Sequence, residues 1–556
     1  MGIDRAKLRW NGWGWTARKD DIAERAEVWT WLAAELGMPA LLAIPGRPLE
    51  ELKLPDSKLS LQDRVELSGI VGANQVRDSV SERAFHALGR SYHDLLRLRA
   101  GDMSSAPDAV VYPRSTDEVL AVIAYASRKR IAVVPYGGGT GVVGGVRGDR
   151  GPFATVIALD VSEMDRVIDI NPTSCTAMVE AGIYGPALEK ALQAKGFTLG
   201  HTPQSFEFST LGGWIAHRGA GQGASRYGRA DDWLVSAKLA TPLGLLSNGD
   251  FPATSAGPRL TDLIVGSEGA FGVITEATLR IRPLPEVCEY RGYLFRDFQS
   301  GAAAIRAAMQ DGCGCAMLRL ADAEETRFQR AYTRLAKIPG AMRRVGNRYL
   351  KIRGYAENSC LLIAGYEGDK QTTALTRRRF GNIAGRFGVV ALGRGAGDDW
   401  RRGRFQAPYL RDPMLDRGVG LDMIETAASW SNLDAVYAAT RAALENALRG
   451  AVPREDARAI VMCHISHAYA DGASLYFTYI FPRRLDGDIE QWKKIKAAAT
   501  EAILANGGTL SHHHGVGVDH LPWMTREKSA LGLDVLRAMK QALDPEGILN
   551  PGKLVP

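Results

Sequence analysis

The chain has 556 residues, of which 46% are hydrophobic and 24% charged, and its formal net charge is +7. This composition is typical of a soluble globular protein, and the length predicts two or three domains. Residues 1–30 lack the apolar core of a secretory signal, no apolar stretch reaches the roughly 18 residues of a membrane span, and the ending Leu554-Val555-Pro556 is not a peroxisomal address.

The basic excess is dispersed, because its densest runs are only Arg377–Arg379 and Arg401-Arg402. Such short runs favour acidic small-molecule partners and no nucleic acid. The pair Cys313 and Cys315 has no second half at zinc-finger spacing, so we expect reduced thiols and no structural zinc.

Residues 1–104 are expected to be mostly helical and irregular. From residue 105 the pattern changes to short apolar strands and amphipathic helices, and we expect residues 105–284 to form a second unit. Its expected elements are strands at 109–113, 131–135, 155–159 and 177–181, helices at 116–128 and 186–195, and a strand–loop–strand segment with strands at 263–265 and 273–281.

Strand–helix alternation after Pro283 and Pro285 predicts a third unit at residues 285–500. A segment at 501–556 follows, in which a helix over 497–508 ends at Asn506-Gly507-Gly508. The next residues are Ser511-His512-His513-His514-Gly515-Val516-Gly517. Three consecutive imidazoles can serve as proton donors, proton acceptors or metal ligands near neutral pH.

A glycine-rich run at 137–145 follows the strand at 131–135. Glycine lets backbone N–H groups converge on an anion and lets a pyrophosphate approach closely. The run is neither a Walker A loop nor a GxGxxG fingerprint. Two further loops, Ser205–Gly213 and Gly266–Gly272, also combine glycines with hydroxyl residues. Three such loops predict one shared, large polar ligand.

Several of these segments resemble the FAD-binding domain of the vanillyl-alcohol-oxidase flavoprotein superfamily: Pro135–Thr140, Val179–Gly182, Gly266–Gly269 and Ile274–Ala277. Within it the chain resembles the alkyldihydroxyacetonephosphate synthase (alkylglycerone-phosphate synthase) family nearly end to end. The segments that carry this closer resemblance are Trp10–Gly14, Gly200-His201, Phe206–Trp214, Leu318–Leu320, Tyr409–Asp412, Glu425-Thr426 and Ile503–Gly517.

The resemblance implies an α+β fold, with a two-subdomain PCMH-type FAD-binding domain and a cap domain built on an antiparallel sheet. It implies that residues 501–556 return to the FAD-binding domain, and that two chains form a homodimer. The family exchanges the acyl group of acyl-dihydroxyacetone phosphate for a long-chain alcohol in ether-lipid synthesis. FAD takes part without net redox change, after proton abstraction at C1. No cysteine or histidine lies in the loop at 137–145, so non-covalent FAD is expected.

The resemblance also assigns roles to residues. Tyr476 matches the family's catalytic tyrosine, whose pKa nearby cations are expected to lower. Arg319 matches an arginine near the flavin, Arg411 the arginine of the substrate phosphate, and His512–His514 the catalytic histidine cluster. Alternation along Tyr476–Phe481 predicts a strand with Tyr476 and Thr478 on one face. The residues expected to bind FAD are Pro135, Tyr136, Gly137, Gly138, Gly139, Thr140, Gly141, Gln204, Ser205, Ser209, Thr210, Gly213, His217, Gly266, Ser267, Glu268, Gly269, Gly272, Val273 and Ile274.

Two other functions stay open. An FAD-linked D-2-hydroxyacid dehydrogenase would use a metal site, and His464 could supply one ligand. Leu475 occupies the position of the second histidine, however, and a leucine cannot bind a cation. We therefore expect no metal. A non-catalytic flavin- or lipid-binding protein is the third alternative.

The chain departs from the family pattern at two places. His464 stands where the family usually has an arginine, and the segment Gln222–Arg226 is less lysine-rich. Both differences bear on the identity of the substrate. The Ala-, Gly- and Arg-rich composition fits a bacterial cytoplasm, with peripheral membrane contact to collect lipid substrates.

Overall fold

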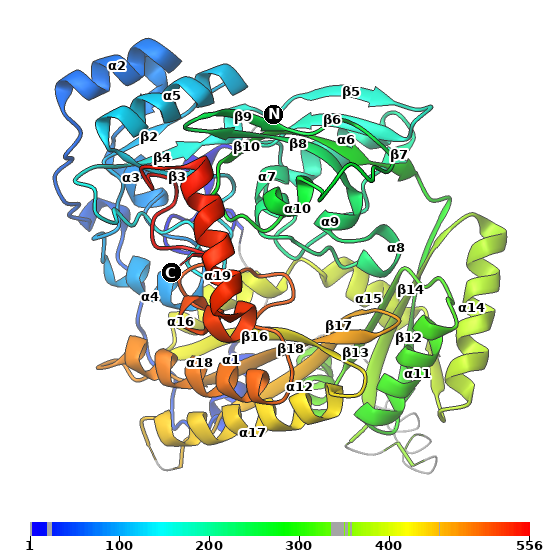
Figure 1. Ribbon diagram of the computed structural model, residues 1–556. Helices are drawn as coiled ribbons and strands as arrows, with labels where there is room; N and C mark the ends of the chain where they lie inside the picture. Colours follow the sequence, from blue (N-terminus) through cyan, green and yellow to red (C-terminus); the bar gives the residue numbers. More distant parts are fainter. Residues whose placement is uncertain are drawn as a thin grey trace.

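The computed structural model describes residues 3–18, 25–334, 350, 354–355, 358–454 and 456–555. Two sheets formed by the first half of the chain lie above a larger sheet formed by the second half (Figure 1). The N-terminal region contributes helices and one short strand. Its α-helices are α1 (Ala26–Glu35), α2 (Leu61–Val71), α3 (Val80–Phe85) and α4 (Tyr92–Ala100).

The first sheet has the strand order β1-β2-β4-β3. Its strands β2, β4 and β3 run parallel, and β1 pairs antiparallel at the edge. The bounds are Val76–Arg77 (β1), Ala109–Val111 (β2), Ala132–Tyr136 (β3) and Val156–Asp160 (β4). Helix α5 (Thr116–Lys129) begins after Ser115, whose side chain accepts a hydrogen bond from the Glu118 backbone, as the cap signal predicted.

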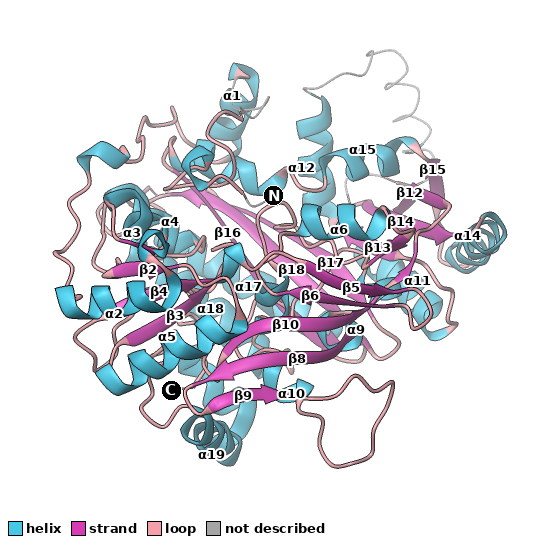
Figure 2. Cartoon of the chain, turned by 90° about the horizontal axis from the view of Figure 1, so that it is seen from above, coloured by secondary structure: helices cyan, strands magenta, loops and turns pink. Residues whose placement is uncertain are grey.

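The second sheet is antiparallel, with the order β5-β6-β10-β8-β9. Its strands are β5 (Val167–Asn171), β6 (Thr176–Glu180), β8 (Leu234–Thr241), β9 (Gly244–Ser247) and β10 (Val273–Arg280). Seen from above, it lies across the strands of the larger sheet (Figure 2). Helices α6 (Gly185–Gln193) and α7 (Leu211–Ala216) pack against this sheet.

The predicted strand at 263–265 is wrong. Leu263 and Ile264 belong to the short helix α10 (Thr261–Ile264), and the Val265 backbone N–H bonds the carbonyl of Thr261. Periodicity cannot distinguish a strand from a buried helical turn in so short an apolar run.

The third sheet is antiparallel throughout and confirms the predicted α+β class with an antiparallel cap sheet; its order is β15-β12-β14-β13-β17-β18-β16. The bounds are β12 (Val287–Phe295), β13 (Met317–Ala321), β14 (Cys360–Gly368), β15 (Val390–Gly393), β16 (Val419–Ser429), β17 (Ile460–Ala468) and β18 (Gly472–Pro482). Helices α11 (Phe298–Gln310), α14 (Lys370–Gly385), α17 (Leu433–Ala451) and α18 (Asp488–Ala505) cover one face.

Strand β18 shows the predicted alternation. Phe477, Tyr479 and Phe481 are buried in the core beneath the helices. Tyr476 and Thr478 line a cavity on the opposite face. The sheet therefore presents one side to its own core and the other to the first half of the molecule.

The C-terminal segment runs back to the first half of the chain. Helix α18 ends at Ala505, and Gly507 has φ +81°, as the glycine signal predicted, although the helix begins earlier than expected, at Asp488. Helix α19 (Met524–Leu543) then contributes Met524 and Leu533 to the core of the antiparallel β5–β10 sheet. Leu549 pairs in parallel with Val133 of β3. The loop carrying the histidines is thus held between both halves.

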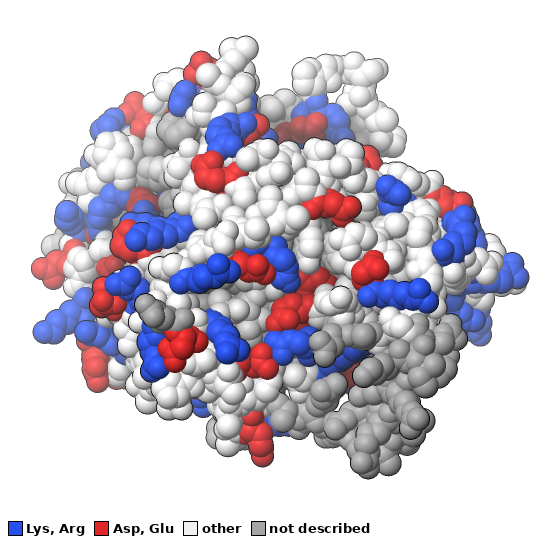
Figure 3. Space-filling model, turned by 90° about the horizontal axis from the view of Figure 1, so that it is seen from below, with Lys and Arg blue, Asp and Glu red and all other residues white. Residues whose placement is uncertain are grey.

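Charges are mixed on the face seen from below, where basic and acidic side chains interleave (Figure 3). This view agrees with a basic excess that is dispersed rather than gathered into a track. Among the described residues, no helix is both long and apolar enough to cross a membrane.

Candidate active site

A cavity of about 1490 Å³ lies between the glycine-rich loops and the face of the third sheet that is opposite its helices. It exceeds the roughly 300–1,000 Å³ of an ordinary small-molecule pocket. Both halves of the chain contribute to its wall, together with the histidine loop. The cavity can therefore hold a large cofactor and a second ligand at once.

The glycine run forms one end of this cavity directly after β3. Gly137–Gly141 all line it. A Cβ atom on Gly138 would lie 1.9 Å from the backbone oxygen of Phe208, so two loops pack here at a distance that only glycine permits. Thr210 Oγ1 and His217 Nδ1 are buried without a hydrogen-bond partner, and both residues face the cavity. Unpaired donors and acceptors beside a glycine cradle fit the phosphates and polar ring of FAD.

The structure brings together nearly all of the residues expected to bind FAD. The residues from Pro135 to Gly141, from Gln204 to His217 and from Glu268 to Ile274 that were expected at this site all line the cavity. Gly266 and Ser267 do not line it. Their backbone N–H groups bond the carbonyls of Ile215, in α7, and Ile264, in α10.

The opposite wall is the face of the third sheet that its helices do not cover. Register places Tyr476 on β18 between Glu425 of β16 and His464 of β17. Arg319 of β13 and Arg411, in the short helix α16 (Arg411–Leu415), line the same cavity. His513 and His514 also line it, whereas His512 does not. Residues far apart in sequence thus surround one space.

Tyr476 is 9% exposed, and its ring stacks on His464 with a centroid distance of 4.9 Å. Burial raises the pKa of Tyr476, and the carboxylates of Glu425 and Asp422 add to this, while Arg411 and Arg319 oppose it. The expectation of a lowered pKa is therefore wrong, because burial outweighs the two cations. The hydroxyl is protonated at neutral pH and is a hydrogen-bond donor in this state.

Arg319 is part of an ionic network around the buried carboxylate of Glu325. Its Nη2 lies 2.6 Å from Glu325 Oε1, and His464 Nδ1 lies 2.8 Å from Glu325 Oε2. Burial alone would raise the pKa of Glu325, but Arg319 and His464 outweigh it and lower that pKa to about 2. The carboxylate fixes both partners beside the Tyr476 ring.

Arg411 is 3% exposed and donates from Nη1 to the backbone oxygen of Arg90 at 2.8 Å. Its Nε is buried without a hydrogen-bond partner. Burial lowers the pKa of Arg411, although nearby Asp422 and Asp412 oppose this. A cavity-facing guanidinium with an unused N–H is suited to binding an anion.

Glu425 is the main site residue that the sequence did not assign a role. Its carboxylate is 1% exposed and accepts hydrogen bonds from Ser511 Oγ at 2.6 Å and from the backbone N–H groups of His512, His513 and His514 at 2.8–3.0 Å. Burial would raise the pKa of Glu425, but the adjacent histidines, His513 and His514 first, hold it well below its usual range. The histidine loop is therefore wrapped around one buried negative charge.

A second carboxylate holds the other end of this loop. Glu268 accepts from the backbone N–H groups of Val516 and Gly517 at 2.6 and 2.7 Å. Glu425 belongs to the third sheet, and Glu268 to a loop of the FAD-binding half. The two carboxylates fix the histidines relative to both walls of the cavity.

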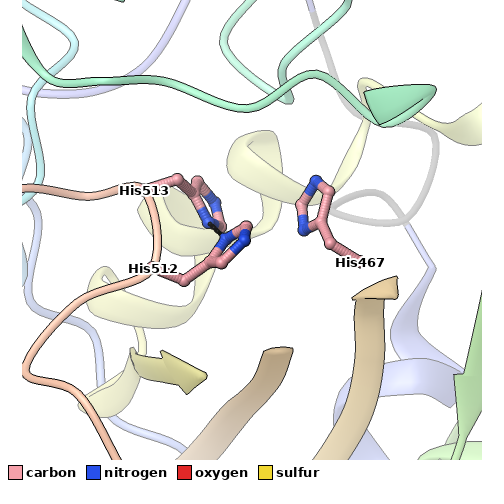
Figure 4. A group of neighbouring side chains, drawn as sticks. All are labelled: His467, His512 and His513. Carbon is pink, nitrogen blue, oxygen red and sulfur yellow. Dashed lines mark hydrogen bonds between the residues drawn. The ribbon is translucent and has the colours of Figure 1, made fainter. Parts of the chain in front are cut away.

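The rings of His467, His512 and His513 point toward one another (Figure 4), and one ring nitrogen from each lies within 4.8 Å of the others. His512 Nδ1 and His513 Nδ1 are 2.9 Å apart. Two nitrogens bound to one tetrahedral zinc ion would lie about 3.3 Å apart, given bonds of roughly 2.0–2.1 Å. The 2.9 Å between His512 Nδ1 and His513 Nδ1 is instead a hydrogen-bond distance.

Replacing Gly138 with alanine should abolish FAD binding. The new methyl group would clash with the backbone of Phe208, and a backbone cannot move aside as a side chain can by changing its rotamer. Such overpacking costs about 1–3 kcal/mol or more. The measurement is the flavin content of the purified protein by absorbance. Gly381→Ala is the matched control, because Gly381 has no atom within 4 Å of the added Cβ. A Gly138→Ala protein that retained its full flavin would contradict the assigned cradle.

Comparison with known proteins identifies both halves of the chain. Residues 107–248 match an FAD binding domain, and residues 284–554 match the C-terminal domain of FAD linked oxidases. The chain is 33% identical to alkyldihydroxyacetonephosphate synthase of Trypanosoma brucei brucei, over 99% of this chain and 92% of that protein. The Dictyostelium discoideum protein of the same name is 32% identical, over 99% and 94%. A solved structure of an alkyldihydroxyacetonephosphate synthase superimposes with a TM-score of 0.84 at 30% identity, over 99% of this chain and 100% of that one.

Proposed function

This chain belongs to the alkyldihydroxyacetonephosphate synthase family of FAD enzymes, and we propose that it exchanges the acyl group of acyl-dihydroxyacetone phosphate for a long-chain alcohol. The observation that carries this proposal is the convergence of Tyr476, Arg319, Arg411, His513 and His514 on the cavity of the FAD-binding loops. The family resemblance assigned these residues to the reaction together with His512, which does not line the cavity.

The exchange breaks the bond between C1 and the ester oxygen and forms a bond between C1 and the alcohol oxygen. The acyl group leaves with both of its oxygens as a carboxylate. The hydroxyl proton of the alcohol is released, because a carboxylic acid with a pKa near 4 is ionised at neutral pH. When bound beside these residues, FAD would supply an electron-accepting ring, and the exchange has no net redox change.

We propose that Arg411 binds the substrate phosphate. Its buried position strengthens the attraction for an anion, and its free Nε adds a donor to those of the guanidinium fork. An apolar part of the cavity wall suits the hydrocarbon chains. These apolar residues form two clusters, Met317, Leu361 and Ile363 in one and Leu421, Met462 and Ile480 in the other.

Tyr476 and the pocket-facing histidines are the candidates for proton transfer at C1. The His514 ring lies 5.5 Å from the Tyr476 ring, edge to face. Burial keeps the pKa of His514 well below its usual range, so this imidazole is neutral. Arg319 lines the same cavity and is suited to stabilise the departing carboxylate. We therefore assign proton transfer to Tyr476 together with His513 and His514.

The decisive assay mixes the purified yellow protein anaerobically with palmitoyl-dihydroxyacetone phosphate and hexadecanol. We expect release of palmitate and formation of the alkyl ether in equal amounts, with no electron acceptor added. Bleaching of the flavin by D-lactate or D-2-hydroxyglutarate, with turnover only in the presence of a dye, would instead identify a 2-hydroxyacid dehydrogenase.

The family resemblance supports a further prediction about assembly, and the Ala-, Gly- and Arg-rich composition supports one about location. We propose that two chains form a homodimer, which light scattering would test. We also propose that the protein works in the cytoplasm and contacts a membrane surface to collect its lipid substrates, which sedimentation with phospholipid vesicles would test.

A further inference from the structure

The proposed exchange produces one proton per turnover inside a cavity that cofactor and lipid fill, and hydrogen-bonding groups lead from that cavity to Tyr469, a half-buried residue next to exposed Ala470. The path starts at His513, which lines the cavity. His513 Nδ1 lies 2.9 Å from His512 Nδ1. His512 Nε2 in turn lies 2.6 Å from the hydroxyl of Tyr469.

The two hydrogen-bond distances connect the three residues in the order His513, His512, Tyr469. His512 is 6% exposed and is not part of the cavity wall, so it sits behind His513. Tyr469 follows the end of β17 and is only half-buried. Both contacts have hydrogen-bond distances. His512 uses Nδ1 toward His513 and Nε2 toward Tyr469, and His513 uses Nδ1 toward His512 and keeps Nε2 for the cavity.

We propose that His513, His512 and Tyr469 form the exit path for the proton that the exchange releases, an inference that rests on the proposed function. His513 takes a proton from the cavity at Nε2 and gives its Nδ1 proton to His512 Nδ1. His512 gives its Nε2 proton to the Tyr469 oxygen, and the phenol gives its own proton to water. At every step one N–H or O–H bond forms and one breaks, and no residue keeps the charge.

The charges around the path suit this role. Glu425 Oε2 lies 3.4 Å from His513 Nδ1 and stabilises the imidazolium that forms when His513 accepts a proton. Burial and the neighbouring His513 lower the pKa of His512 to about 3, so the middle of the path is neutral and passes the proton on. Arg229 donates to the His512 carbonyl at 3.3 Å and stands beside Tyr469 at the outer end. His467 stacks on His512 at 4.8 Å, and burial together with His512 and His513 keeps its pKa well below its usual range.

The test is Tyr469→Phe, which removes one hydroxyl and keeps the ring. We expect kcat in dilute buffer to fall about tenfold or more, since a positioned proton-transfer group contributes roughly 10²- to 10⁴-fold and water can replace part of the path. The solvent deuterium isotope effect on kcat should rise, because proton release becomes rate-limiting. Added imidazole should restore turnover, while flavin content and substrate KM stay unchanged.

The matched control is Tyr125→Phe, because Tyr125 donates its hydroxyl to Asp63 on the outside of the first sheet. His512→Asn is a second variant that interrupts the path at its middle, and it should show the same rescue by imidazole. A Tyr469→Phe enzyme with wild-type kcat in dilute buffer would overturn the path, as would a loss that imidazole does not restore. Failure of the proposed function would be seen separately, as a wild-type protein that makes no ether.

Discussion

Replacing Tyr476 with phenylalanine should lower kcat by roughly 10²- to 10⁴-fold, the usual contribution of a positioned proton-transfer group. The ring would remain stacked on His464, and the glycine loops that hold FAD would be unaffected. FAD should therefore stay bound, and KM should change little. The measurement is steady-state ether formation together with flavin content.

Tyr479→Phe is the control on the same strand. Tyr479 faces the opposite side of β18 and donates to Asp422 at 2.9 Å in the core. Trp492 Nε1 also donates to that oxygen, so the control should cost only about 0.5–1.5 kcal/mol of stability and leave kcat intact. Wild-type turnover in Tyr476→Phe would refute the assignment of this tyrosine.

The Glu425→Gln protein should be less stable by about 3 kcal/mol and should lose most of its activity. The carboxylate accepts hydrogen bonds from three successive backbone N–H groups and from Ser511. The glutamine amide has only one oxygen to accept these hydrogen bonds. Its NH₂ group is itself a donor and would face the backbone N–H groups. Disrupting a buried charged network of this kind costs roughly 3–5 kcal/mol. Denaturant unfolding and ether formation by the folded enzyme are the two measurements.

This effect has a defined pH dependence. The pKa of Glu425 is lower in the folded protein than in the unfolded chain, so the carboxylate adds stability that is fully present above the unfolded pKa of about 4.3. That contribution is lost as the pH falls through the lower, folded-state pKa. The stability gap between wild type and Glu425→Gln should be constant near neutral pH and should narrow below about pH 4.

Glu445→Gln is the matched control, because Glu445 is 47% exposed and its ion pair with Arg441 is screened by solvent. If Glu425→Gln unfolded at the same midpoint denaturant concentration as the wild type, other contacts would have to hold the histidine loop.

The two walls of the cavity differ in how far sequence could predict them. The glycine loops were recognisable because glycine at the end of a strand has few structural uses, and the expected FAD residues line the cavity apart from Gly266 and Ser267. The face of β18 was also predictable, since alternation in a strand assigns Tyr476 and Phe477 to opposite sides. Glu425 was visible only as part of a family motif, because a single glutamate in an apolar strand carries no sign of what surrounds it.

Sequence alone determined the family, the cofactor and the identity of the pocket-facing tyrosine and arginines, because these depend on local motifs that the chain carries from end to end. Tertiary structure decided the properties that depend on burial and convergence. It raised the pKa of Tyr476 where cations had been expected to lower it, because desolvation depends on every segment that covers the ring. It also separated the three histidines, placing His513 and His514 at the cavity and His512 behind them. The three consecutive histidines occupy different positions because Glu425 and Glu268, from the two halves of the chain, bind the backbone of their loop at its two ends.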